Sequence, residues 1–215
     1  MARLALFFSL LGCHLLFYGL WRSLVAGNNV KKRAWGLTLE ISSLYSALGL
    51  YWVWAFCASL ASGTTLHLLA QQTPFDEACI TLMISYLVVD LCVGVFEYRS
   101  QLRVDTTYAH HVLYFSLEVF CLLNGYARYY LLFAILELPT CVLALGSAFP
   151  SLRSDALFGT TFVATRIAYE VFAAAALLLV GAPMPLHLLA PPVVASLAMH
   201  VVWMRSWMTP KKVKV

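Results

Sequence analysis

Three titratable side chains stand at the head of a hydrophobic segment in the stretch DTTYAHHVLYFSLEVF, residues 105–120. His110 and His111 are adjacent, and Glu118 follows His111 at a spacing that places both on one face of a helix. Imidazole titrates near neutral pH, so it can accept a proton or an acyl group. A carboxylate on the same face can orient the ring or polarise a nucleophile. These residue types favour proton transfer or acyl transfer at this point of the chain.

Four further ionisable residues fall inside hydrophobic segments, and they are Asp90, Glu137, Arg166 and Glu170. Ionisable groups at membrane depth cost roughly 2.5–3.5 kcal/mol on insertion scales and normally face a protein interior or a cavity. At a rise of about 1.5 Å per residue, Asp90 lies about 10 Å inside the nearer boundary and Glu170 about 20 Å. Three groups lie between them at about 13–15 Å, namely Glu118, Glu137 and Arg166. We therefore expect a polar chamber inside a helical bundle, open at one end and capped there by the two histidines.

Other interpretations apply to the same residues. Arg166 and Glu170 are four apart, so they can form a neutralising structural pair on one helix. Asp90 and Glu137 can be neutral core groups that are hydrogen-bonded to neighbouring helices. Adjacent histidines diverge by about 100° on a helix, and spacings such as HExxH are absent, so no metal site is predicted. The remaining histidines show no partner spacing and are predicted to be structural or interfacial; they are His14, His67, His187 and His200.

The composition places the chain among multi-pass membrane proteins. Of 215 residues, 62% are hydrophobic and 11% are charged, the mean hydropathy is +0.82, and soluble domains average roughly 45–50% apolar residues. The net charge of +4 comes from short basic blocks beside hydrophobic spans, so it does not indicate a nucleic-acid partner. All six cysteines fall within apolar segments, which predicts small core residues rather than disulfides or a zinc site.

A membrane-spanning helix needs about 20 mostly apolar residues. Seven segments qualify, at 3–21, 36–61, 77–96, 109–124, 127–148, 157–181 and 186–207. The first ends in bulky aromatic residues and is longer than a signal-peptide core, so we expect it to remain as a span. The chain then divides into an N-terminal helix with a basic loop (1–35), a six-helix core (36–208) and a basic tail (209–215).

The basic residues indicate the orientation of the bundle. One side collects eleven of them, in the loops after the first, third and fifth spans and at the C-terminal end: Arg22, Lys31, Lys32, Arg33, Arg99, Arg103, Arg153, Arg205, Lys211, Lys212 and Lys214. The opposite side holds only Arg3 and Arg128. Because cytosolic loops carry the excess of basic residues, we expect a cytosolic C-terminus and a chamber that opens to the cytosol.

Four motifs on consecutive spans give the chain a family resemblance. SYLVVDLCVG, YAHHVLYF, ELPTCVLAL and FVATRIAYE occur in that order within residues 36–208. This set resembles the TLC-domain family, which includes ceramide synthases and translocating-chain-associating proteins, and it is most similar to the small TLC-domain-containing proteins. The resemblance implies six core helices around a cavity reached from the cytosol, an endoplasmic reticulum or related endomembrane location, and a role in sphingolipid or phospholipid metabolism.

In ceramide synthases the tandem histidine belongs to the catalytic acyl-transfer motif, so the resemblance implies that role for His110 and His111. This chain departs from those enzymes further on, because their Leu-His-Asp stretch is replaced by ILELPTCVLALGSAF, which contains neither His nor Asp. Glu137 is the acidic residue of that stretch.

Two classes of function follow. The first is a lipid-homeostasis protein that holds a lipid or acyl chain in the chamber, with Asp90, Glu118, Glu137, Arg166 and Glu170 as its binding groups and no cofactor. The alternative is an N-acyltransferase that takes acyl-CoA as co-substrate and uses His110 and His111. An ER cargo receptor ranks lower. A proton-coupled transporter also ranks lower, because inverted repeats and paired broken helices are not visible. The sequence does not decide whether the protein is an enzyme.

Overall fold

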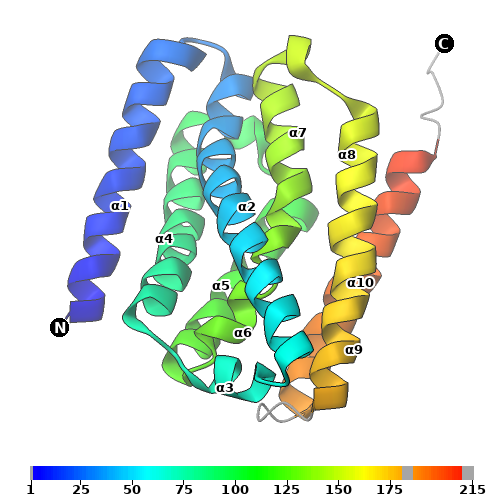
Figure 1. Ribbon diagram of the computed structural model, residues 1–215. Coiled ribbons are helices and arrows are strands. Elements are labelled where there is room, and N and C mark those ends of the chain that lie inside the picture. Colours follow the sequence, from blue (N-terminus) through cyan, green and yellow to red (C-terminus); the bar gives the residue numbers. More distant parts are fainter. Residues whose placement is uncertain (1, 181–185, 210–215) are drawn as a thin grey trace.

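The computed structural model describes residues 2–180 and 186–209, apart from the side chains of Ala70, Asp105, Thr106 and residues 186–191. This part of the chain is helical and contains no strand. Successive helices run up and down the molecule, so that the N-terminus lies at one end and the last helix leads to the other (Figure 1). The predicted all-α membrane bundle is confirmed. The predicted basic tail, apart from Thr209, lies outside the described residues.

The helical passes match the predicted spans to within a few residues at most boundaries. They are α1 (Ala2–Trp21), α2 (Val30–Ser62), α4 (Pro74–Glu97), α5 (Ala109–Leu123), α6 (Ala127–Leu131) with α7 (Leu138–Ala148), α8 (Asp155–Phe162) with α9 (Glu170–Val180), and α10 (Leu186–Met208). A short helix, α3 (Thr65–Ala70), lies between α2 and α4. A 3₁₀ segment, Ala134–Glu137, joins α6 to α7, and a π-helical segment, Val163–Tyr169, joins α8 to α9.

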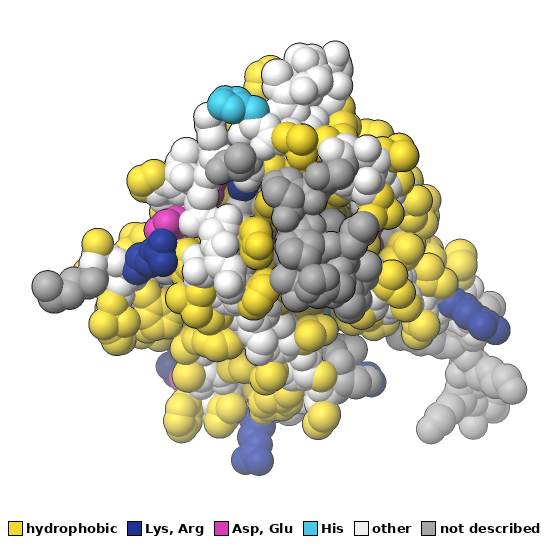
Figure 2. All heavy atoms as spheres, turned by 90° about the horizontal axis from the view of Figure 1, so that it is seen from below, with side chains coloured by type: hydrophobic (Ala, Val, Ile, Leu, Met, Phe, Trp, Pro, Cys, Tyr) yellow, Lys and Arg dark blue, Asp and Glu magenta, His cyan; other side chains and the backbone are white. Residues whose placement is uncertain are grey.

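Length and composition suit a membrane for most of these passes. The segments Ala2–Ala26, Val30–Ser62, Pro74–Glu97 and Asp155–Val180 are long and apolar enough to span one, and Ala109–Leu123 and Ala134–Ala148 are shorter apolar helices. The 15-residue α5 continues a five-residue π-helical segment, Val104–Tyr108, and the two together reach the about 20 residues that a span needs. Large hydrophobic side chains are exposed along the helices, and they cover much of the surface in the end-on view (Figure 2).

The two ends of the bundle differ in charge. The connections at 22–29, 98–108 and 149–154 and the end of α10 lie together at one end, the upper end in Figure 1. We call it the basic end, because it carries the basic residues of those loops. The opposite end holds the N-terminus, α3 and the turn at Asn124-Gly125, where Gly125 has a φ of 77° as the predicted turn requires.

Helix α2 is the centre of the bundle, and it packs closely on α7 and on the 3₁₀ segment before it. Gly49 allows this approach, since a Cβ atom there would lie 2.3 Å from the backbone nitrogen of Ile135. Leu37, Ile41 and Phe56 of α2 are almost fully buried in the main hydrophobic core. The core therefore sits around α2, with α1 and α10 at opposite edges of the molecule (Figure 1).

Ion pairs hold α1 against this core at both ends. Arg3 donates from Nε and Nη2 to both carboxylate oxygens of Glu77, at 2.8 and 2.7 Å. At the basic end, Arg22 and Arg33 donate to the two oxygens of Glu97, at 2.7 and 3.1 Å. These contacts fix the position of a helix whose outer surface is otherwise apolar.

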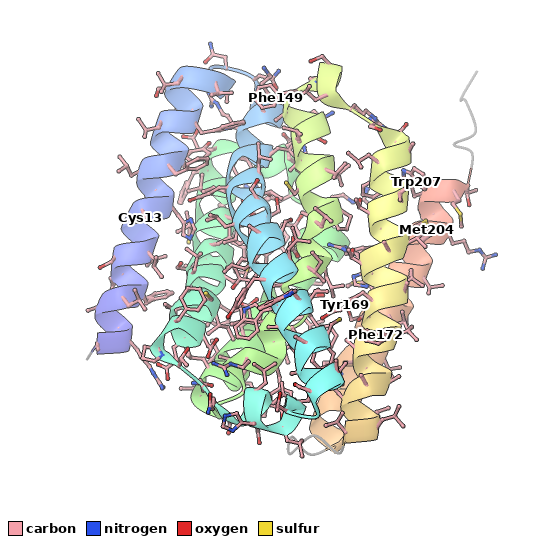
Figure 3. The ribbon with its side chains drawn as sticks, in the orientation of Figure 1. Cys13, Phe149, Tyr169, Phe172, Met204 and Trp207 are labelled. Carbon is pink, nitrogen blue, oxygen red and sulfur yellow. The ribbon has the colours of Figure 1, made fainter. Side chains whose placement is uncertain are left out.

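The predicted burial of the cysteines is wrong for half of them. Cys79 and Cys121 are buried and Cys141 is half-buried, but Cys13, Cys57 and Cys92 are exposed on the outside of the bundle (Figure 3 labels Cys13 on α1). All six are free thiols. Hydrophobic segments in a membrane have a lipid-facing side, so an apolar position along the chain does not by itself indicate the core.

Candidate functional site

A cavity of about 680 Å³ lies inside the bundle, and six of the seven predicted site residues line it. These six are Asp90, His110, His111, Glu118, Glu137 and Arg166. They come from the third, fourth, fifth and sixth passes, the consecutive spans on which the sequence places ionisable residues at similar depths. The predicted convergence of these side chains on one chamber is confirmed. Glu170, the seventh residue, does not line the cavity.

The lining of the cavity continues to the basic end. Trp35 comes from the start of α2, Gln101 from the connection after α4, and Ser206 and Trp207 from the end of α10. Figure 3 shows Met204 and Trp207 where α10 runs beside α8, and the rings of Trp207 and Phe158 lie 5.5 Å apart. The mouth is therefore formed by aromatic side chains next to the basic loops.

His111 has a hydrogen bond at one ring nitrogen and a close carboxylate at the other. Nδ1 donates to the carbonyl of Thr107, one turn back, at 2.9 Å. Nε2 lies 3.1 Å from Asp90 Oδ2, although the contact is not aligned well enough to count as a hydrogen bond. The 3.1 Å approach of two buried ionisable groups makes it an electrostatic contact regardless of that angle. Because a carbonyl can only accept, Nδ1 carries a proton, and Nε2 is the nitrogen that faces Asp90.

Asp90 is fixed from its other side by Tyr98, which follows the end of α4. Tyr98 Oη donates to Asp90 Oδ1 at 2.7 Å, and both residues are buried. The carboxylate beside the His111 ring is that of Asp90 and not the predicted Glu118. Helices α4 and α5 pack side by side and bring Asp90 and His111 to the same level.

His110 differs from His111 at Nδ1, which in His111 bonds the carbonyl of Thr107. Its Nδ1 atom is buried and has no hydrogen-bond partner in the described part of the chain. The ring packs 4.3 Å from that of Tyr114 and 6.1 Å from that of Trp203. His110 Nδ1 is thus a nitrogen that is available to a ligand.

Glu118 lies further along α5 and is completely buried. Tyr130, on α6, donates a short hydrogen bond from its hydroxyl to Glu118 Oε1. The second carboxyl oxygen, Oε2, has no partner among the described residues. Glu118 and His111 both line the cavity, so the predicted shared face is confirmed.

Arg166 is the one buried arginine of the cavity lining, and it binds the irregular segment before α7. Nε donates to the carbonyl of Leu136 at 2.9 Å and Nη2 to Thr140 Oγ1 at 2.7 Å. Glu137 Oε1 is 3.9 Å away, and the guanidinium lies over the rings of Phe162 and Trp203. The predicted pairing of Arg166 with Glu170 is wrong. Arg166 reaches Leu136, Thr140 and Glu137 of the segment before α7, whereas Glu170 contacts His200 of α10, so the two side chains have different partners.

Glu170 pairs with a histidine that showed no partner in the sequence. His200 Nδ1 donates to Glu170 Oε2 at 2.9 Å, and both side chains are almost fully buried between α9 and α10. His14 makes a similar contact, with Nδ1 3.1 Å from Glu40 Oε2 between α1 and α2. The sequence shows no partner spacing for these two histidines because the partners lie on other helices, and both contacts lie between packed helices, outside the cavity lining. His67 bonds Gln71 one turn along, and the side chain of His187 lies outside the described residues.

A third buried pair lies at the end opposite the cavity mouth. Arg128 donates from Nε and Nη2 to Asp76 Oδ2, at 3.1 and 2.6 Å, and from Nη1 to the carbonyl of Leu68. Asp76 also caps α4 by accepting from the backbone N–H of Thr73. The capping pattern Thr73-x-x-Asp76 is visible in the sequence, but nothing in it identifies Arg128 as a partner.

Irregular helical segments surround the cavity. The π-helical segment 104–108 precedes the histidines, and the π-helical segment 163–169 contains Arg166 and faces the 3₁₀ segment 134–137. Such segments are often found at functional sites, because they alter the direction of side chains and free backbone carbonyls. Here Arg166 and Tyr169 bind the freed carbonyls of Leu136 and Leu132. Among the described residues, no group of three His, Cys, Asp or Glu side chains is placed to hold a metal ion.

None of the family models, curated proteins and solved structures compared with the chain matches it. The functional assignment consequently depends on the geometry of the cavity and on the residues that line it. That geometry is a ring of titratable side chains inside an aromatic and apolar lining, within a bundle whose outer surface is hydrophobic.

Proposed function

We propose that this protein is a multi-pass membrane protein of lipid homeostasis that holds one lipid or acyl chain in its cavity. The observation that carries the proposal is the lining of that cavity. Apolar and aromatic side chains, among them Leu143, Phe162 and Trp203, surround a small number of polar groups. Ligand sites are commonly cavities of about 300–1,000 Å³ with this composition, in which the polar groups fix the orientation of the ligand.

The position of the cavity favours a ligand from the membrane. Its walls are helices whose outer faces carry exposed hydrophobic side chains, so a lipid reaches it from the surrounding bilayer or through the mouth. We propose that the basic end is cytosolic, because basic residues collect in its loops. An endoplasmic reticulum or related endomembrane location, and membership of the TLC-domain family, belong to the same proposal and are supported by the four sequence motifs.

Acyl transfer is the second candidate, and the contact between His111 and Asp90 favours it. In that reaction an amine nitrogen attacks the carbonyl carbon of an acyl-CoA, the amide bond forms as the carbon–sulfur bond breaks, and the amine proton passes to a base. His111 Nε2 lies beside Asp90, which would stabilise the protonated ring, and His110 has a free nitrogen nearby. The absence of His and Asp from ILELPTCVLALGSAF counts against this candidate.

Purification of the intact protein distinguishes the two functions. Lipid mass spectrometry measures any lipid that copurifies, and an acyl-CoA consumption assay with a long-chain amine measures turnover. A stoichiometric lipid without turnover supports the binding function, and turnover supports the transferase. Absence of both contradicts a lipid function.

The double variant His110→Ala, His111→Ala links either readout to the cavity. We expect it to lose the bound lipid or the turnover while it is still produced and folded. His67→Ala is the matched control, since His67 is exposed and lies outside the cavity lining. Loss of folding in the double variant alone would return the two histidines to a structural role.

A further inference from the structure

The polar chemistry of the cavity is incomplete at Glu118. This side chain is 0% exposed, yet Oε2 has no hydrogen-bond partner among the described residues. No lysine, arginine or histidine in the described part of the chain forms an ion pair with it. Burying a polar atom without a partner costs about 1–3 kcal/mol, so such an atom beside a cavity indicates a ligand group that completes it.

The hydrogen bond from Tyr130 defines what that group must do. Tyr130 donates to Oε1, so Oε1 is an acceptor and only Oε2 remains for the ligand. Oε2 accepts a hydrogen bond when the carboxyl group is ionised and donates one when it is protonated. A hydroxyl group both donates and accepts, so it satisfies Oε2 in either state. An ammonium group can only donate, and a carboxylate can only accept.

The cost of desolvation also favours a hydroxyl group as the partner of Oε2. A neutral hydroxyl is far less costly to bury than an ammonium or a carboxylate, and the site at Glu118 is fully shielded from solvent. Glu137 lines the same cavity, so an anionic ligand would face a second acidic side chain. Arg166, also in the lining, disfavours a cation.

We propose that the cavity binds a single-chain lipid with a neutral hydroxyl head group, and that Glu118, positioned by Tyr130, binds this hydroxyl through Oε2. The inference rests on the proposed lipid-holding function and adds the chemical class of the ligand. The hydroxyl sits eight residues beyond His110 on α5, about 12 Å deeper in the membrane. The alkyl chain lies toward the aromatic mouth, along Phe158, Trp203 and Trp207.

Photoaffinity labelling of the intact protein in detergent or nanodiscs tests this inference. The probes are a long-chain alcohol, amine, carboxylic acid and alkane that carry the same diazirine at the same carbon of chains of equal length. The labelling yield on peptides of α8 and α10 is measured by mass spectrometry. We expect the alcohol to label these peptides roughly two- to tenfold more than the alkane, and more than the amine or the acid, as one added hydrogen bond predicts.

Two variants at Glu118 separate the hydroxyl contact from the fit of the chain. Glu118→Gln keeps an oxygen for Tyr130 and gives the ligand an N–H donor, so the alcohol should label within about twofold of its original level. Glu118→Leu removes the contact, so alcohol labelling should fall to the level of the alkane while alkane labelling stays the same. Glu77→Gln is the matched control, since Glu77 lies outside the cavity lining and pairs with Arg3.

The outcomes distinguish this inference from the function on which it rests. If the alkane and the alcohol label equally, or the amine or acid labels best, the hydroxyl site is wrong and the lipid cavity stands. If Glu118→Leu leaves alcohol labelling at its original level in a folded protein, Glu118 does not bind the hydroxyl and the hydroxyl site is again wrong. If no probe labels the cavity peptides, the lipid-holding function itself is contradicted.

Discussion

His111 and His200 each lie against a buried carboxylate, in two different parts of the molecule. His111 lies 3.1 Å from Asp90, His200 lies 2.9 Å from Glu170, and all four side chains are buried. The first pair lines the cavity, whereas the second fills the contact between α9 and α10. His200 is enclosed by the rings of Phe162 and Trp203, at 5.9 Å from each.

The difference shows that burial and pairing do not by themselves identify a functional site. A histidine and a carboxylate that satisfy each other inside a helix contact stabilise the fold and have no space for a ligand. The same two groups beside a cavity can exchange a proton or a hydrogen bond with a bound molecule. Access to the cavity, rather than the chemistry of the pair, separates the two roles, and variants of each pair should therefore affect different properties.

Glu170→Ala should have the largest effect, and this effect should be on stability. It leaves His200 Nδ1 buried without a partner, and breaking a buried pair from one side costs about 3 kcal/mol. We expect a clearly lower midpoint of thermal unfolding in detergent, with unchanged lipid retention by the folded fraction. Glu170→Gln, which keeps an acceptor oxygen, should recover much of the loss. Normal stability of Glu170→Ala would remove the basis for calling this pair structural.

Asp90→Asn should have the opposite profile. The amide oxygen can still accept from Tyr98, so we expect the unfolding midpoint to stay close to that of the original protein. The amide cannot stabilise a charged His111, so lipid retention or acyl transfer should fall about tenfold. Lipid mass spectrometry and the acyl-CoA assay measure the loss. A fall in stability as large as that of Glu170→Ala would show that the two pairs have the same role.

Much of this architecture follows from the sequence because it depends on one-dimensional quantities. Hydrophobic length placed the spans, and counting residues along each span gave the depth at which Asp90, Glu118, Glu137 and Arg166 meet. The Asn124-Gly125 pair marked the turn before α6. These predictions require no knowledge of how each helix is rotated, and the structure confirms them.

The partners of these residues could not be predicted, because a partner depends on helix rotation and on local departures from α-helical geometry. Glu40 lies 26 residues from His14, and His200 lies 30 from Glu170, so no spacing rule connects either pair. The i,i+4 rule failed for Arg166 and Glu170 because each side chain has its partner on a different segment of the chain. Nothing in the sequence indicates that Tyr130 bonds Oε1 of Glu118, or that Oε2 of Glu118 has no partner among the described residues.

His14→Phe tests a pair of intermediate character. His14 is fully buried, but the Glu40 side chain is 16% exposed, so water can partly solvate Glu40 when its partner is removed. We expect a loss of stability of about 1 kcal/mol, smaller than that of Glu170→Ala, with lipid retention unchanged because His14 and Glu40 do not line the cavity. The same thermal unfolding measurement gives the ranking. A loss of stability larger than that of Glu170→Ala would mean that exposure of the carboxylate does not determine how much stability is lost when a pair is broken.

Arg3→Gln should have the smallest effect, although its contact with Glu77 has the best geometry of the four. Arg3 donates two short hydrogen bonds to that carboxylate, but its side chain is 53% exposed. Exposed pairs contribute about 0–1 kcal/mol, because water solvates both charges once they separate and holding two long side chains costs entropy. We therefore expect a shift of the unfolding midpoint at the limit of detection, and a smaller one at high salt. If Arg3→Gln destabilises the protein as much as Glu170→Ala, the geometry of an ion pair governs its contribution to stability, and its access to water does not. The difference between the Asp90–His111 pair and the Glu170–His200 pair would then have to be explained by geometry.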